Sequence, residues 1–142
     1  MENRFKNLIA LIEPLKNDSY GEWFVDREHK EDDESIQFPY PIYTEVVDKL
    51  IDAIYQIEEN YPEYELTRYG EILEKHSIKW GQREMESVEV SNMDLQCVLA
   101  LLMGMVRAER FCNGAIMGML RSGAVLRWLQ RIEEIYESSK LY

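Results

Sequence analysis

The sequence predicts a mainly α-helical protein in which about six helices surround a buried central helix and a small β-hairpin lies in the N-terminal third. Apolar residues recur at helical spacing along most of the chain. The run of residues 97–106 is apolar on every side, which is typical of a helix buried in a core. Two short runs rich in β-forming residues account for the hairpin. We expect residues 1–142 to form a single compact domain, because this length suits one core.

The N-terminal third combines one helix with the hairpin. Apolar spacing predicts the helix over residues 3–16, and the segment "NDSYG" ends it. The two strands are expected at residues 23–25 and 36–38, joined by the charged stretch 26–35. A hairpin of this size is unstable alone, so we expect it to pack against helices.

The middle of the chain contains two further predicted helices. Thr44 is the expected N-cap of a helix over residues 44–59, whose apolar residues form one stripe. A shorter helix is expected over residues 68–76. The segment that follows has an irregular pattern, with a brief extended piece at residues 88–90.

The central helix is predicted over residues 92–109. Ser91 and Asp94 have the spacing of a capping box at its start, with Asp in place of the usual Glu. No polar face interrupts the run that follows, so this helix is expected to form the axis of the fold.

Two C-terminal helices are predicted over residues 112–121 and 124–138. Gly114 and Gly118 lie one turn apart in the first of them, and we expect them to let another backbone approach closely. Gly123 is the expected C′ residue between the two helices.

Charge is distributed unevenly along the chain. The net charge is −11, from 16 basic and 27 acidic residues. Residues 1–90 carry 10 basic and 22 acidic residues, which gives −12, whereas residues 91–131 carry five arginines and two acidic residues, which gives +3. Phosphate contact requires a basic surface, so we expect no direct nucleic-acid binding. A basic protein partner would be attracted.

The compartment is predicted from the cysteines and from the apolar runs. Only Cys97 and Cys112 are present, and no secretory leader pattern precedes them, which predicts a reduced, cytoplasmic protein. The longest strongly apolar run is residues 97–106, whereas a membrane-spanning helix needs about 20 residues. We therefore expect no membrane segment.

The segment "RAERFCNG" places several charged residues directly after the apolar run. Arg107 and Arg110 are three residues apart and share a helix face, while Glu109 points elsewhere. In one interpretation the arginines pair with carboxylates of the acidic half and lock the helices together. In the other, Arg107 and Arg110, with Arg121 and Glu109, form a pocket for a small anionic ligand. Both interpretations stay open.

No catalytic, metal or cofactor site is predicted. Nearby arginines would lower the thiol pKa of Cys112. A nucleophilic cysteine also needs a general base, however, and the two histidines, His29 and His76, are far from Cys112 in the sequence. Two cysteines and two histidines at unrelated spacings do not form a zinc site, and the acidic run "EDDES" lacks the spacing and glycine of a calcium loop. No phosphate-binding or dinucleotide-binding glycine motif is present. Glu109 would act as a general acid or base only in a buried cleft.

Aromatic residues cluster near the hairpin and after the helix of residues 44–59. The cluster consists of Trp23, Phe24, Phe38, Tyr40, Tyr43, Tyr61, Tyr64, Tyr69 and Trp80. We expect these side chains to cover the helical core, since each aromatic buries a large area. The alternative is that they form a binding surface or the wall of a pocket.

Several segments resemble a family of small uncharacterised bacterial and phage proteins. The resemblance extends from about Gly21 to Ile132 and includes "GEWFVD", "IQFPYPIYTEVVDKLIDAIY", "LTRYGEIL" and "IKWG". Its strongest marker is "RAERFCNG" followed by "SGAVLRWLQRI". The resemblance implies a compact, cytoplasmic, prokaryotic protein with a domain of unknown function and no assigned activity. It also identifies Arg107, Glu109, Arg110 and Phe111 as the centre of the family pattern.

The first functional hypothesis is a non-catalytic binding module that uses the arginine cluster or the acidic surface. The second is an enzyme or sensor for a small anionic metabolite at Arg107, Arg110 and Glu109. The third is an acidic inhibitor that occupies a nucleic-acid site on a host protein. The partner is not specified by the sequence, and a homodimer is compatible with it.

Overall fold

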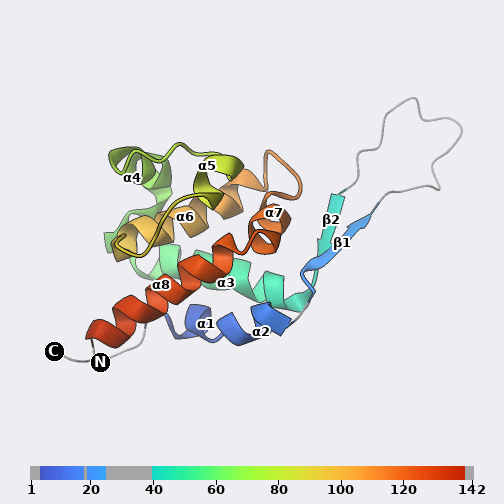
Figure 1. Ribbon diagram of the computed structural model, residues 1–142, viewed down its shortest axis with the longest axis horizontal. Coiled ribbons are helices and arrows are strands. Elements are labelled where there is room, and N and C mark those ends of the chain that lie inside the picture. Colours follow the sequence, from blue (N-terminus) through green and yellow to red (C-terminus); the bar gives the residue numbers. More distant parts are fainter. Residues whose placement is uncertain (1–3, 18, 25–39, 140–142) are drawn as a thin grey trace, which may run out of the picture.

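The computed structural model describes residues 4–17, 19–24 and 40–139. Eight α-helices, two 3-10 turns and two strands lie within these ranges. Figure 1 shows the helices gathered into one body, with α6 (Leu95–Ala108) lying between α4 (Tyr69–Lys75) and α5 (Gln82–Glu86) on one side and α3 (Glu45–Asn60) and α8 (Ala124–Ser139) on the other. The mainly helical fold with a central helix and a small hairpin is therefore confirmed.

The predicted helix over residues 3–16 is in fact two short helices, α1 (Lys6–Ile9) and α2 (Ile12–Asn17). Pro14 is the third residue of α2. Proline has no N–H to donate and is tolerated in the first turn of a helix, where amides have no partner in the helix. A helix break just before Pro14 satisfies this requirement.

The hairpin pairs β1 (Gly21–Phe24) with β2 (Tyr40–Tyr43) in antiparallel register. The second strand is thus formed by the proline-containing segment, and the predicted strand at residues 36–38, like the connection 26–35, lies outside the described residues. Pro41 is opposite Trp23. A proline is accepted in this strand because a two-stranded ribbon leaves one edge without ladder hydrogen bonds.

Helices α3 and α4 lie close to the predicted ranges and are joined by the 3-10 turns η1 (Pro62–Tyr64) and η2 (Leu66–Arg68). Thr44 occupies the N-cap position of α3, but its hydroxyl makes no capping bond and donates instead to the Ser19 carbonyl at 2.9 Å. This bond ties the start of α3 to the segment before the hairpin.

Helix α5 was not predicted, and the expected extended piece at residues 88–90 forms no strand. Helix α5 has only five residues, and Met85 is the one that is fully buried. A single buried residue cannot show the repeat of apolar positions that indicates a helix in the sequence. The added α5 and the division of the first helix account for the difference from the six predicted helices.

Helix α6 begins three residues later than predicted. Asp94 is itself the N-cap, and its Oδ1 accepts a hydrogen bond from the Cys97 amide at 2.9 Å. The capping box that places Ser91 at the cap is therefore wrong. Ten consecutive residues of α6, Cys97–Val106, are buried, as expected of a central helix.

Helix α7 (Ala115–Arg121) begins after Gly114, which has φ +94° and is the N-cap rather than an interior residue. The prediction of close backbone approach at Gly114 and Gly118 is wrong, because side chains fill both places. A Cβ at Gly114 would lie 2.3 Å from the Trp23 ring, and a Cβ at Gly118 would lie 2.1 Å from the Gln82 amide. Gly123 has φ +85° and separates α7 from α8, as predicted.

Candidate functional site

Arg107 lies in the last turn of α6 and reaches α3. Its Nη2 is 3.4 Å from both carboxylate oxygens of Glu58, and its guanidinium lies over the Tyr55 ring, 5.6 Å from the ring centre. The two charged side chains are only 25% and 19% exposed. The Nε of Arg107 is buried and has no hydrogen-bond partner among the described residues. This ion pair therefore joins the central helix to α3 in a partly desolvated environment.

Arg110 follows the end of α6 and is exposed. Its Nη2 donates to the Tyr55 hydroxyl at 3.2 Å. Tyr55 thus contacts both arginines, one through its ring and the other through its hydroxyl. The structure brings Arg107 and Arg110 together at this tyrosine, with one acidic partner, Glu58, already in place.

Arg121 lies at the end of α7 and is exposed. Within the described part of the chain, no hydrogen bond or ion pair joins it to Glu58 or Tyr55, the residues that Arg107 and Arg110 contact. The structure therefore places the third arginine of the predicted set outside the contacts that join the other two.

The Glu109 carboxylate covers the start of α7. Its Oε2 accepts from the Gly114 amide at 2.7 Å, and its Oε1 accepts from the Ile116 amide at 2.9 Å. The Tyr43 hydroxyl of β2 donates to Oε1 at 2.6 Å. A carboxylate at a helix N-terminus satisfies amides that lack a partner within the helix. Three donors therefore engage this carboxylate.

Tyr43 extends the same network to the next amide of α7, because the Met117 N–H points to its hydroxyl at 3.3 Å. Burial raises the pKa of the Tyr43 hydroxyl well above its ordinary value, and the hydrogen bond to Glu109 raises it further. Tyr43 and Glu109 therefore fix the hairpin to the α6–α7 turn (residues 109–114).

The two cysteines occupy different environments. Cys97 is buried in α6, and burial raises the pKa of its thiol to about 12, so it remains an unreactive thiol at neutral pH. Cys112 is exposed in the α6–α7 turn. No histidine contact accompanies Cys112 among the described residues.

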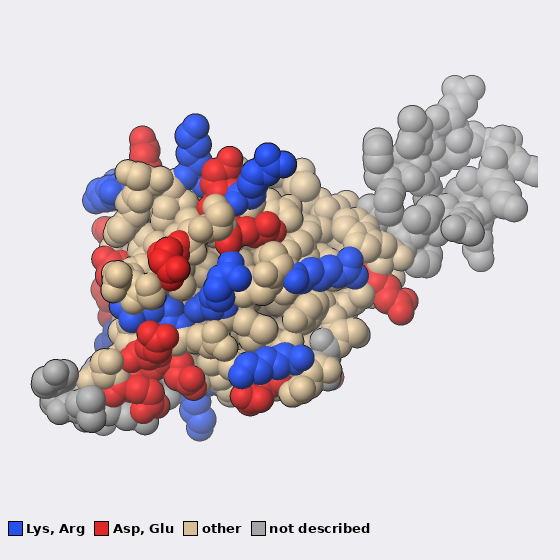
Figure 2. Space-filling model, viewed as in Figure 1, with Lys and Arg blue, Asp and Glu red and all other residues tan. Residues whose placement is uncertain are grey.

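Three exposed aromatic side chains surround the α6–α7 turn. Phe111 is 79% exposed, and Trp23 and Trp80 are each 43% exposed. Phe111 meets Trp80 edge-on with ring centres 6.1 Å apart, and the Trp23 ring lies against Gly114. We call Trp23, Trp80 and Phe111 the aromatic surface. Figure 2 shows that the face over the α6–α7 turn and toward the hairpin carries few charged side chains.

Hydrogen bonds hold the Trp80 indole and the backbone of the α6–α7 turn in place. The Trp80 Nε1 donates to the Gly104 carbonyl of α6 at 3.0 Å. The indole packs closely against Gly104, because a Cβ at this position would lie 3.2 Å from the ring. The amides of Phe111 and Cys112 both donate to the Ala108 carbonyl, at 3.0 and 2.9 Å. An exposed phenylalanine is therefore presented on a turn with a fixed backbone.

A pocket of about 520 Å³ adjoins the aromatic surface at Trp80. It is lined by Gly70, Glu74, Ser77, Ile78, Lys79 and Trp80. The sequence analysis identified Trp23 and Trp80 as part of an aromatic cluster and Phe111 as part of the family pattern. It did not predict that Phe111 contacts Trp80. An aromatic residue within the polar segment "RAERFCNG" was the signal that could have indicated it.

The residues that the structure describes contain no cluster of three or more His, Cys, Asp and Glu side chains suited to a metal ion. None of the described helices has the length and apolar character needed to cross a membrane.

Comparison with known protein families matches residues 1–138 to a family of unknown function (DUF6508). Neither the curated proteins nor the solved structures give a match to this chain. The match covers almost the whole chain, including every residue of the arginine cluster, the Glu109 network and the aromatic surface. The protein therefore belongs to this family of unknown function (DUF6508).

Proposed function

We propose that the protein is a non-catalytic interaction module that binds a protein partner through the aromatic surface. The observation that carries the proposal is Phe111, a large apolar side chain that is 79% exposed on a rigid turn. Aromatic residues are enriched at protein interfaces and contribute much of their binding energy. A preorganised anchor loses little conformational entropy on binding.

The polar groups near this surface support a binding role over a catalytic one. Glu109 is engaged by three donors, and Arg107 is paired with Glu58. In this proposal they act as a structural clamp that fixes the turn, rather than as an anion pocket. Arg110 and Arg121 are exposed and are not part of this clamp.

The partner we propose has a basic surface with an apolar pocket that accepts Phe111. The net charge of −11 would attract such a surface and accelerate its association, and this attraction would weaken with salt. An acidic inhibitor of a nucleic-acid-binding protein would share this salt dependence. Dependence on Phe111 distinguishes the two, because charge mimicry does not require an exposed phenylalanine. We propose that the interaction takes place in the cytoplasm of a bacterial or phage-infected cell, on the sequence resemblance and the two free thiols.

The test compares Phe111→Ser with Ile42→Ser. Ile42 is also exposed, at 53%, but it is opposite Glu22 in the hairpin and so lies on the other face of the ribbon from Trp23 and Tyr43. Immobilised wild-type protein and both variants are exposed to cell lysate at low and high salt, and the retained proteins are identified by mass spectrometry. We expect the same basic protein to be retained by wild type and Ile42→Ser and lost with Phe111→Ser.

Light scattering of the purified protein completes the test. Retention that is equal for all three proteins contradicts the proposal. Wild-type self-association that Phe111→Ser abolishes also contradicts it, because the surface would then join two copies of this chain.

A further inference from the structure

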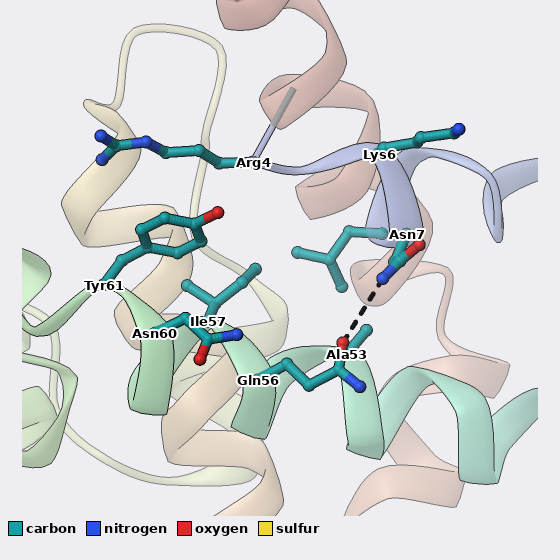
Figure 3. A pocket seen from close by; sticks show the side chains of 9 residues that line it. Arg4, Lys6, Asn7, Ala53, Gln56, Ile57, Asn60 and Tyr61 are labelled. Carbon is teal, nitrogen blue, oxygen red and sulfur yellow. Dashed lines mark hydrogen bonds between the residues drawn. The ribbon is translucent and has the colours of Figure 1, made fainter. Parts of the chain in front are cut away.

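The α6–α7 turn contains Asn113, the one asparagine in the sequence that a glycine follows. In an Asn–Gly pair the glycine nitrogen can attack the asparagine side chain, because glycine has no Cβ to shield that nitrogen. Each of the other asparagines precedes a residue with a side chain; they are Asn3, Asn7, Asn17, Asn60 and Asn92. Figure 3 shows Asn7 on α1 and Asn60 on α3, and the Asn7 carboxamide donates to the Gln56 carbonyl oxygen at 3.4 Å. Asn113 is therefore the asparagine whose sequence context favours a reaction between the backbone and its own side chain.

The side chain of Asn113 is free to take part in this reaction. Asn113 is exposed, and its carboxamide has no hydrogen-bond partner among the described residues. In the reaction a bond forms between the Gly114 nitrogen and the Asn113 Cγ, and the bond from Cγ to the side-chain nitrogen breaks. The Gly114 amide proton leaves with that nitrogen as ammonia, and a five-membered succinimide ring remains. Water then opens the ring at either carbonyl and gives an aspartyl or a β-aspartyl linkage, so no oxidant or reductant is required.

The backbone around Asn113 forms a type II turn. The Ala115 amide donates to the Cys112 carbonyl at 3.2 Å, and Gly114 has φ +94° and ψ 4°. Asn113 itself has a negative φ. These are the features of a type II turn with Gly114 as its second central residue, and the first central residue of such a turn has ψ of about +120°.

This turn keeps the reacting atoms of Asn113 and Gly114 apart. At the ψ of a type II turn, the Gly114 nitrogen is rotated away from the Asn113 Cβ. A nearly planar succinimide ring requires the same nitrogen and Cβ to be eclipsed about the Cα–C bond of Asn113. Ring closure therefore needs a large rotation of the Asn113 ψ angle.

The same rotation would break the contact between the turn and Glu109. The Gly114 N–H lies in the peptide plane that rotates with ψ of Asn113, and it donates to the Glu109 Oε2 at 2.7 Å. The carboxylate is itself fixed by the Ile116 amide and the Tyr43 hydroxyl. A hydrogen bond to a charged acceptor makes such an opening about ten- to hundredfold rarer. Glu109 therefore holds the turn in its unreactive form.

We propose that Asn113 is a conditional modification site, unreactive while Glu109 caps α7 and converted to an aspartyl or β-aspartyl residue when the turn opens. Both products add a negative charge to the turn, and the β-aspartyl product also adds a methylene group to its backbone. The longer backbone cannot restore the type II turn. The consequence for the partner rests on the proposed function: a modified turn would no longer present Phe111 in the same position, so binding would decline as the protein ages.

The first experiment compares the folded and unfolded full-length protein. Wild type is incubated at pH 8, either in buffer or in guanidinium chloride. Peptide mapping by mass spectrometry detects the replacement of NH₂ by OH at Asn113 and separates the two products. We expect Asn113 to be modified at least about tenfold more slowly in the folded protein. Equal rates in the two conditions would overturn the proposal, because the turn would then give no protection.

Two variants separate the Glu109 cap from overall stability. Glu109→Gln removes the charge of the acceptor and should accelerate modification of the folded protein about three- to tenfold. Arg107→Ala is the matched control, since it also lowers stability, through the ion pair with Glu58, but leaves the cap in place. It should be modified at the wild-type rate. An unchanged rate in Glu109→Gln, or an equal acceleration in Arg107→Ala, would overturn the proposal.

Hydrogen exchange of wild type tests the cap without any substitution, should Glu109→Gln fail to fold. The Gly114 amide should exchange at least about tenfold more slowly than in the unfolded chain. Exchange of Gly114 at the unfolded rate would overturn the proposal. Neither the mass measurement nor the exchange measurement involves a partner, so failure here leaves the partner proposal untouched.

Discussion

The Tyr43 hydroxyl donates a 2.6 Å hydrogen bond to the Glu109 carboxylate, across 66 residues of sequence. The same carboxylate accepts from two amides at the start of α7. One acidic side chain therefore joins the hairpin, the end of α6 and the beginning of α7. The aromatic surface is built on this junction, so its integrity can be tested by changing either partner.

Replacement of Glu109 by glutamine should destabilise the protein by about 1–3 kcal/mol. The amide keeps one acceptor oxygen but presents an NH₂ group to at least one buried donor, which then lacks a partner. Urea denaturation measures the free energy of unfolding. Glu59→Gln, at an exposed position of α3, is the control and should change stability by less than about 0.5 kcal/mol. Equal effects of the two substitutions would contradict the capping role.

Tyr43→Phe should reduce the sensitivity of the fold to alkali. The pKa of Tyr43 is raised in the folded protein, chiefly by burial, whereas in the unfolded chain it has its ordinary value. The protonated Tyr43 hydroxyl therefore contributes its full share of the free energy of unfolding below the ordinary tyrosine pKa of about 10. This contribution is lost as the pH rises through the pKa of Tyr43 in the folded protein. Urea denaturation at pH 8 and at successive values above 10 should show a smaller loss of stability in Tyr43→Phe than in wild type. Identical pH dependences would indicate that Tyr43 does not contribute.

The two arginines should differ in their contribution to stability. Arg107→Ala removes a partly buried ion pair and a contact with the Tyr55 ring, and leaves Glu58 only 19% exposed without its partner. We expect a loss of about 1–3 kcal/mol, below the 3–5 kcal/mol typical of a fully buried pair. Arg110→Ala removes one exposed hydrogen bond and should cost less than about 1 kcal/mol. Urea denaturation of both variants measures the two losses of stability. A larger loss in Arg110→Ala than in Arg107→Ala would show that Arg110, and not Arg107, joins the helices.

Gly114 should not accept alanine. Its φ of +94° is unfavourable for residues with a Cβ, and that Cβ would lie 2.3 Å from the Trp23 ring. We expect Gly114→Ala to cost about 2–4 kcal/mol, from backbone strain and displacement of the indole. Gly70→Ala is the matched control, since nothing lies within 4 Å of its added Cβ and α4 gains a better helix former. Thermal unfolding should show a lower Tm only for Gly114→Ala.

The thiols provide a chemical test of the α6–α7 turn. Cys112 is exposed, whereas Cys97 is buried with a raised thiol pKa. A disulfide reagent such as DTNB should therefore titrate one thiol rapidly in the native protein and the second only on unfolding. Cys112→Ser should abolish the rapid phase. Rapid reaction of two thiols would contradict the burial of Cys97.

The outcome for individual residues shows how far the sequence could lead. Apolar spacing located α3, α4 and α8 to within one residue, because a helix with one buried face has a local signature. The placement of Arg107 and Arg110 on one helix face could also be predicted, because it follows from their spacing in the sequence. Their partners could not be predicted, since Glu58 and Tyr55 lie in a different helix. Glu109 was expected to point away from the arginines, but its role in capping α7 required knowledge of where Gly114 turns the chain.

The sequence by itself determined that this protein is helical, that residues 97–106 form its centre and that its charge is predominantly acidic. The tertiary structure decided which polar groups are satisfied and which apolar groups stay exposed. The physical reason is that the periodicity of burial is encoded within one or two helical turns. Hydrogen-bond and ion-pair partners are chosen instead by packing between segments far apart in the chain. Tyr43 meets Glu109, and Phe111 is left exposed beside Trp80, only because the hairpin, the segment before α5 and the α6–α7 turn are brought together.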